Sequence, residues 1–152
     1  MKQILILLTV VFLSGCTGVN IEDYKNKGPE LKIEQFFQGK STAWGLFRDR
    51  FGKVRREFVV DVKGDWSPED KTLTLVEDFI YDDGETEQRV WRLEKTGENS
   101  YEGTAGGVVG SAKGKSAGNA FNFTYIFDLP VGGDKMRVRF NDWMYLQDNN
   151  TL

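Results

Sequence analysis

Two kinds of residue in this sequence could do chemistry: one cysteine near the amino terminus, and a few charged side chains set among apolar ones. The 152 residues include no histidine and a single cysteine, Cys16. Nucleophiles of the Ser-His-Asp or Cys-His kind, histidine-based metal sites and an intrachain disulfide are therefore excluded. What remains is reaction of the Cys16 thiol and recognition of a polar group by charged side chains.

The first fifteen residues are typical of a secretion signal. Lys2 precedes an apolar run from residue 4 to residue 13 that is broken only by Thr9. This run is shorter than the roughly 20 residues that a membrane-spanning helix needs. We therefore expect a signal peptide at residues 1–15.

The residues next to Cys16 indicate where this signal is cut. Ser14 and Gly15 are small and directly precede Cys16, as in a bacterial lipobox. We expect lipidation of Cys16, with palmitate or a related acyl chain, so that a lipid anchor holds the mature protein to the membrane. Thr17, where an aspartate would favour the inner membrane, favours the cell outer membrane, with the domain facing the periplasm. A simple signal peptide or a free thiol at Cys16 stays open as an alternative.

Three charged side chains fall on the apolar face of predicted strands. Arg56 alternates with Phe58 and Val60, Glu77 lies between Leu75 and Phe79, and Arg89 precedes Trp91 by two residues. An unpaired buried charge costs several kcal/mol, so we expect the three to be partners across neighbouring strands. They could simply fix the register or lie at a wet barrel mouth. Alternatively, the two arginines receive the anionic head of a lipid or fatty acid.

An aromatic stripe is the natural place for the tail of such a ligand. The residues that we expect to bind it are Arg56, Glu77, Arg89, Trp91, Phe121, Phe123, Tyr125 and Phe127. Packed core is the simpler interpretation of this stripe, together with Trp44 and Trp143, because small barrels fill with such side chains. The sequence does not decide between a packed and a hollow interior.

Two further motifs resemble ligand-binding loops but lack features that those loops need. The stretch Gly110–Ser116 ends like a phosphate-binding loop, but Val109 stands where that loop needs glycine, and a strand pattern follows in place of a helix. The acidic residues of Glu77–Glu85 lack the alternating ligand spacing of a calcium loop. We expect no metal site and no cofactor, and the net charge of −3 gives no basic footprint for nucleic acid.

The elements that position these residues are predicted to be strands. Residues 16–28 are polar, and we expect them to form a tether. The domain follows at residues 29–152. It begins with a short helix, which we expect to end at Gly39. Eight strand-like runs with a period of two then alternate with turn signals. No helical crossover separates them, so we expect an antiparallel up-and-down β-barrel of about eight strands, with a two-sheet sandwich as the alternative.

Several segments resemble the bacterial lipoproteins grouped as domain of unknown function 3833. The segments are Ala43–Gly45, Glu77–Glu85, Arg89–Trp91, Gly103–Ala105, Val108–Gly110, Gly118–Ala120 and Asp142–Asp148. The resemblance implies a lipocalin-like barrel without an established activity, encoded near enzymes of fatty-acid and membrane-lipid modification.

These observations together suggest a binding protein. We expect a lipid-anchored envelope lipoprotein that binds or transfers a hydrophobic or acyl-lipid ligand. A structural or adaptor lipoprotein with a packed core is the first alternative. An accessory lipid-modifying enzyme is the second, although no side chain stands beside a recognisable general base, so we expect no catalytic residues.

Overall fold

A computed structural model of the protein describes residues 18–152, which form one eight-stranded β-sheet. Its elements are η1 (Ile21–Tyr24), α1 (Ile33–Phe36), β1 (Gly39–Arg48), β2 (Val54–Ser67), β3 (Thr72–Tyr81), β4 (Thr86–Gly97), β5 (Ser100–Thr104), β6 (Ala112–Ala117), β7 (Ala120–Val131) and β8 (Asp134–Tyr145). Each strand pairs antiparallel with the next one along the chain. The predicted all-β, up-and-down architecture is confirmed, and the two-sheet alternative is wrong.

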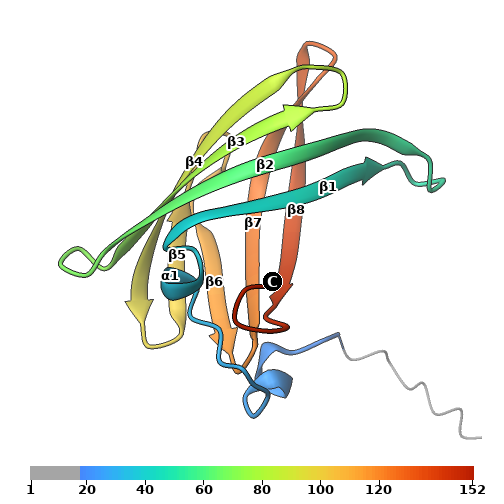
Figure 1. Cartoon of the computed structure of the whole chain (residues 1–152). Helices are drawn as coiled ribbons and strands as arrows, with labels where there is room; N and C mark the ends of the chain where they lie inside the picture. The colour runs from blue at the N-terminus through green and yellow to red at the C-terminus, as the bar shows by residue number, and fades with distance from the viewer. Residues whose placement is uncertain (1–17) are drawn as a thin grey trace, which may run out of the picture.

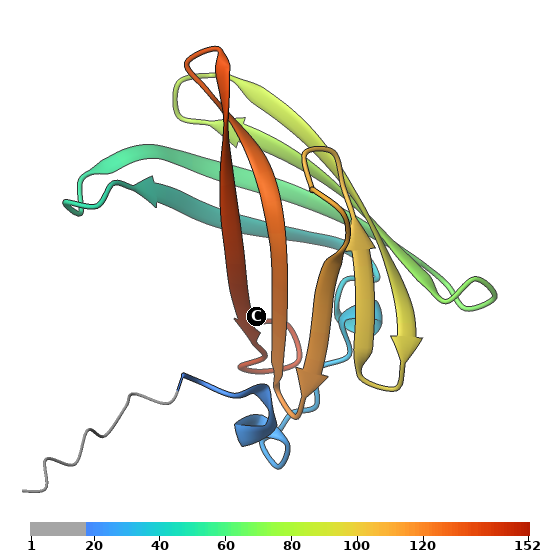
Figure 2. The ribbon, with the colours of Figure 1, turned by 180° about the vertical axis from the view of Figure 1, so that it is seen from behind.

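The sheet curls into a half-barrel (Figures 1 and 2). β1 and β8 are its two edges. In both views β1 runs in a clearly different direction from β8. Strands that diverge in this way cannot align their N–H and C=O groups into a ladder. The expected closure of the barrel is therefore incomplete between β1 and β8.

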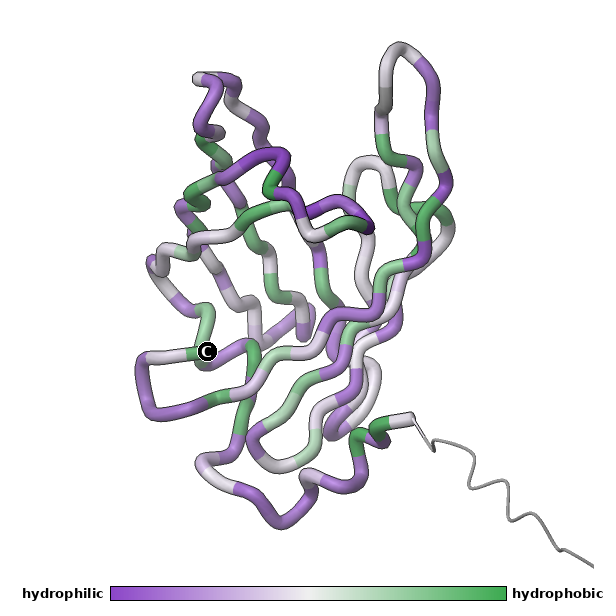
Figure 3. Tube along the Cα trace, turned by 90° about the vertical axis from the view of Figure 1, so that its right-hand side faces the viewer, coloured by the Kyte–Doolittle hydropathy of each residue, from purple (hydrophilic) through white to green (hydrophobic). Residues whose placement is uncertain are grey.

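Hydrophobic and hydrophilic residues alternate along the strands (Figure 3), and buried and exposed side chains alternate with the same period in β2, β3 and β5. In β7, Phe121 and Phe123 are 2% and 5% exposed. The buried core is Leu31, Ile33, Val60, Val62, Leu73, Leu75, Phe79, Tyr81, Trp91, Leu93, Tyr101, Ala112, Phe121, Phe123 and Leu146. The aromatic stripe of β7 thus lies inside, as its period of two predicts.

Trp44 does not belong to this core, contrary to expectation. Its indole is 75% exposed, because Trp44 is opposite Val59, which points outward, whereas Ala43 is opposite the buried Val60. Trp143 is likewise outside the core: it is opposite Asn122 of β7 and stacks on Tyr145 with ring centroids 6.0 Å apart. One residue of shift along a strand reverses the face, which local composition alone does not reveal.

A short helix precedes the first strand, as predicted, although it is a single turn. Ile33 of α1 is 1% exposed and packs into the core. The next side chain, Glu34, is also buried; it accepts hydrogen bonds from the Lys95 ammonium at 2.5 Å and the Tyr101 hydroxyl at 2.7 Å. These contacts hold α1 across one end of the half-barrel (Figure 1).

The described part of the expected tether, residues 18–28, lies near the same end and includes η1. The Asn20 side chain caps η1 by accepting from the Glu22 amide. The Tyr24 ring packs on Tyr145 and Trp143, with centroids 5.2 and 6.0 Å away. The predicted signal peptide and Cys16 lie outside the described residues. Between residues 18 and 152, no helix is long and apolar enough to cross a bilayer.

Candidate ligand cavity

The concave face of the half-barrel forms one wall of an open cavity of about 1260 Å³. This exceeds the roughly 300–1,000 Å³ of common small-molecule sites. Its apolar wall consists of Ile33, Phe36, Phe37, Phe58, Val60, Val62, Leu75, Phe79, Trp91, Leu93, Phe121, Phe123, Tyr125 and Met144. Edge residues of β1 and β8 also line it, together with most of the segment after β8. The cavity therefore reaches the gap between the two edge strands.

The structure brings six of the eight predicted ligand residues to this one cavity: Glu77, Arg89, Trp91, Phe121, Phe123 and Tyr125. The other two lie next to it. Phe127 is buried, with its ring 5.1 Å from the Arg89 guanidinium. Arg56 stands on the rim, close to the turn between β3 and β4.

Trp91 is the centre of the aromatic wall. Its ring meets Phe123 and Tyr125 edge to face, with centroids 5.1 and 5.2 Å apart. Because aromatic pairs favour such geometry, these contacts stabilise the arrangement of the three rings. Trp91 and Phe123 are each 5% exposed, so Tyr125, which is half-buried, is the ring of the three that is most open to the cavity.

Arg89 is inside the half-barrel; one of its terminal nitrogens is paired, while its buried Nε has no hydrogen-bond partner among the described residues. Its guanidinium donates to Glu87 at 2.6 Å and lies about 5 Å from the rings of Phe79 and Phe127. The Tyr81 hydroxyl also donates to Glu87, at 2.8 Å. Burial raises the pKa of Glu87, but these two hydrogen bonds outweigh it and leave the pKa lowered. Glu87 is thus held ionised beside Arg89.

Arg56 is held by the β3–β4 turn and not by Glu77, so the predicted three-way pairing is wrong for this residue. Its guanidinium bonds Asp83 at 2.8 Å and also Glu85. It stacks over the Tyr81 ring, 3.6 Å from the centroid. These partners follow from register: Phe58 is opposite Tyr81, which places Arg56 beside the turn two residues further on.

Glu77 is opposite Arg89, as predicted for neighbouring strands. Burial raises the pKa of Glu77 to about 7, and the charges of Glu87 and Asp142 act in the same direction. The Arg89 charge and a hydrogen bond from Trp91 oppose the shift without cancelling it. Glu77 therefore changes its charge near neutral pH.

Asp142 of β8 is a cavity residue that the sequence reasoning missed. It accepts a hydrogen bond from Tyr125 at 2.9 Å, and burial raises its pKa. Asp142 could have been identified from its place in β8, because it is opposite Phe123, which faces inward. Reading β8 from its pairing with β7 would have put Asp142 on the inner face.

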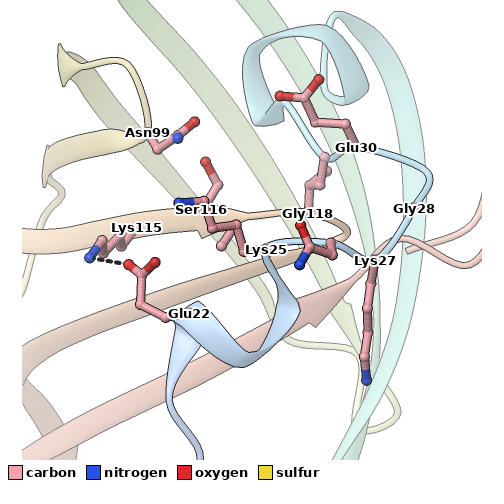
Figure 4. Close-up of a pocket in the computed structure, with 12 residues that line it drawn as sticks. Glu22, Lys25, Lys27, Gly28, Glu30, Asn99, Lys115, Ser116 and Gly118 are labelled. Atoms are coloured by element: carbon pink, nitrogen blue, oxygen red, sulfur yellow. Dashed lines mark ion pairs between the residues drawn. The ribbon is translucent and has the colours of Figure 1, made fainter.

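A second hollow, of about 550 Å³, lies where the η1 segment meets the ends of β5 and β6 (Figure 4). Lys115 and Glu22 pair across it at 2.6 Å. Lys115 and Ser116, the end of the glycine-rich stretch, belong to β6, and a turn at Gly118 leads into β7. This is the strand-and-turn geometry expected there, without the helix amino terminus on which a phosphate loop depends.

Comparison with known proteins places the chain at the level of a family. No curated protein and no solved structure is significantly similar to it. The model of the family described as Protein of unknown function (DUF3833) matches residues 10–152. This match includes every strand and every cavity residue described above, and the chain therefore belongs to the DUF3833 family.

Proposed function

We propose that this protein is a lipid-anchored envelope lipoprotein whose half-barrel binds, and hands over, a hydrophobic or acyl-lipid ligand. The observation that carries the proposal is the aromatic cavity of about 1260 Å³. Ligand sites are typically concave, mostly apolar and supplied with a few polar groups. The inner wall of the cavity has this composition, with Glu77, Arg89 and Asp142 among aromatic side chains, while polar residues of β1 and of the segment after β8 line its open side.

A bound hydrocarbon chain would be stabilised by leaving water. Burial of one methylene contributes about 0.8 kcal/mol. An acyl chain of ten or more carbons thus supplies several kcal/mol, enough to offset the loss of its motional freedom. The gap between β1 and β8 offers a side entrance for such a chain, since both edges line the cavity.

Photo-crosslinking in the bacterial envelope tests this proposal. Phe58 lines the cavity, while the adjacent Val59 is on the outer face and is 36% exposed. Benzoylphenylalanine at position 58 is expected to capture a lipid that mass spectrometry identifies, and the same residue at position 59 is the matched control. The two variants differ by one residue and by the face of β2.

The outcome separates binding from the alternatives. A lipid adduct at position 58 that is several-fold above the level at position 59 supports ligand binding. Equal labelling at both positions would mean contact with bulk membrane only. Absence of a lipid adduct at position 58 would favour the structural or adaptor lipoprotein, which has a packed core and no ligand.

The lipid anchor is tested at Cys16. Labelled palmitate is expected to enter the full chain, and the Cys16→Ala variant is expected to lose the label because it lacks the thiol that carries the acyl chain. Incorporation that persists in Cys16→Ala would remove the anchor from the proposal. Sucrose-gradient separation of the membranes then shows whether the labelled protein is in the outer membrane.

A further inference from the structure

The charged side chains that line the cavity restrict the polar group that a ligand could carry. They are Lys40, Glu77, Arg89 and Asp142. Lys40 is exposed on the edge strand β1, and Arg89 is bound to Glu87 at 2.6 Å. Among the ion pairs of residues 18–152, none includes Glu77 or Asp142. Of the two cations at the cavity, Arg89 is thus paired with a carboxylate and Lys40 is exposed at the edge, while Glu77 and Asp142 have no ion-pair partner among these residues.

The chemistry of these groups favours a donor over an anion. An ionised carboxylate only accepts hydrogen bonds and has about four sites for them. Asp142 uses one of its sites for Tyr125. A ligand carboxylate or phosphate would add a like charge beside both groups, which is unfavourable at low dielectric. An ammonium or hydroxyl group would donate to them.

The aromatic wall adds a second attraction for a cation. Trp91 and Tyr125 line the cavity together with Phe79 and Phe123. The faces of such rings attract ammonium groups, and tryptophan does so most strongly. An aromatic wall with carboxylates beside it resembles the arrangement that proteins use to hold amines.

We propose that the ligand's polar end is a hydrogen-bond donor without negative charge, an ammonium or a hydroxyl group, held at Glu77 and Asp142 with the hydrocarbon tail along the aromatic wall. This inference rests on the proposed function, because it concerns the same cavity. It differs from an anionic head at Arg56 and Arg89, because carboxylates already neutralise both guanidinium groups through a terminal nitrogen, although each buried Nε has no hydrogen-bond partner in the part of the chain that the structure describes.

The pH dependence of binding follows from the groups around Glu77. These are Arg89 and Glu87 of β4, Asp142 of β8 and, at the open edge, Lys40. With its pKa raised to about 7, Glu77 gains negative charge as the pH rises from 6 to 8.5. A bound ammonium that lowers this pKa by one unit would bind about fivefold more tightly at pH 8.5 than at pH 6, because Glu77 is already partly ionised at pH 6.

Three ten-carbon probes test the polar end: decylamine, decanol and decanoate. The full chain is held in an amphipathic polymer in place of detergent, so that no detergent monomer competes, and affinities are measured by calorimetry at pH 6 and 8.5. We expect decylamine to bind most tightly, decanol next and decanoate least. Decylamine affinity should rise about fivefold from pH 6 to pH 8.5.

The Glu77→Gln variant tests the effect of the Glu77 negative charge on binding. We expect it to lose the pH dependence and about tenfold of the decylamine affinity at pH 8.5, with decanol little changed. Glu57→Gln is the matched control, because Glu57 is exposed on β2 at an outward position. If Glu77→Gln does not fold, the pH profile of the unaltered chain decides.

The possible results distinguish failure of this inference from failure of the proposed ligand-binding function. Tightest binding of decanoate, or equal affinity for all three probes, overturns the donor end while ligand binding stands. A decylamine affinity that does not rise with pH also overturns the role of Glu77. Failure of all three probes to bind overturns the proposed function itself.

Discussion

Glu34 shows how one buried residue can fix the base of the half-barrel. Burial raises its pKa, but hydrogen bonds from Lys95 and Tyr101 outweigh burial and hold the pKa below the ordinary value of 4.5. A carboxyl with a depressed pKa in the folded state stabilises that state above the unfolded pKa. This contribution is lost as the pH falls through the folded pKa. Glu34 is therefore one source of acid sensitivity in the fold.

Removing the hydroxyl that Glu34 binds tests this role. Tyr101→Phe is expected to lower the free energy of unfolding at pH 7 by about 1–3 kcal/mol, because one buried carboxylate oxygen loses its donor. Urea denaturation of the full chain measures the change. Tyr145→Phe is the control: its hydroxyl makes a long, 3.4 Å contact with Tyr24, so a change under about 0.5 kcal/mol is expected. Equal losses of unfolding free energy in both variants would show that the hydrogen bond from Tyr101 to Glu34 contributes no more to stability than the long contact of Tyr145.

At the scale of elements, β2 to β7 were predictable because each has buried side chains on one face, whereas the edge strands β1 and β8 have only half-buried and exposed side chains. The pattern in β3 predicts residues 72–81, which is the range that the structure has, and β7 is equally clear. Turn residues predicted where the strands end, as at Gly84, where a φ of +85° suits glycine. Fold class and most of the cavity wall followed from these local signals.

What could not be predicted depends on contacts between distant elements. Gly64 of β2 is an example: a Cβ there would lie 1.8 Å from the Phe37 carbonyl oxygen, so α1 crosses β2 only because this residue is glycine. The local sequence does not reveal whether Gly64 is a turn residue or, as the structure has it, a strand residue in close contact with another segment. The same holds for Arg56 and Asp142, whose partners depend on register and on which strand pairs with which. The polar part of the site therefore needed the structure.

For the whole molecule, the decisive feature is that the sheet has two edges and a cavity open between them. A barrel closed by hydrogen bonds would have no edge, whereas β1 and β8 each have a neighbour on one side only. β1 contributes small inward residues, Ala43 and Gly45, where β7 contributes phenylalanines. The apolar wall is thus strongest at β7 and weakest at β1, which suits entry of a ligand on the β1 side.

Hydrogen exchange of the full chain should reveal these edges. Every other amide of β1 points away from β2, so we expect these amides to exchange at least about tenfold faster than those of β3, which is paired on both sides. Decylamine at saturating concentration should slow exchange at β1 and β8 and leave β5 unchanged, because both edges line the cavity. The measurement is mass spectrometry of peptic peptides with and without the amine. Equal protection of β1 and β3 in the absence of any ligand would contradict an open edge, and would mean that another strand pairs with β1 in solution.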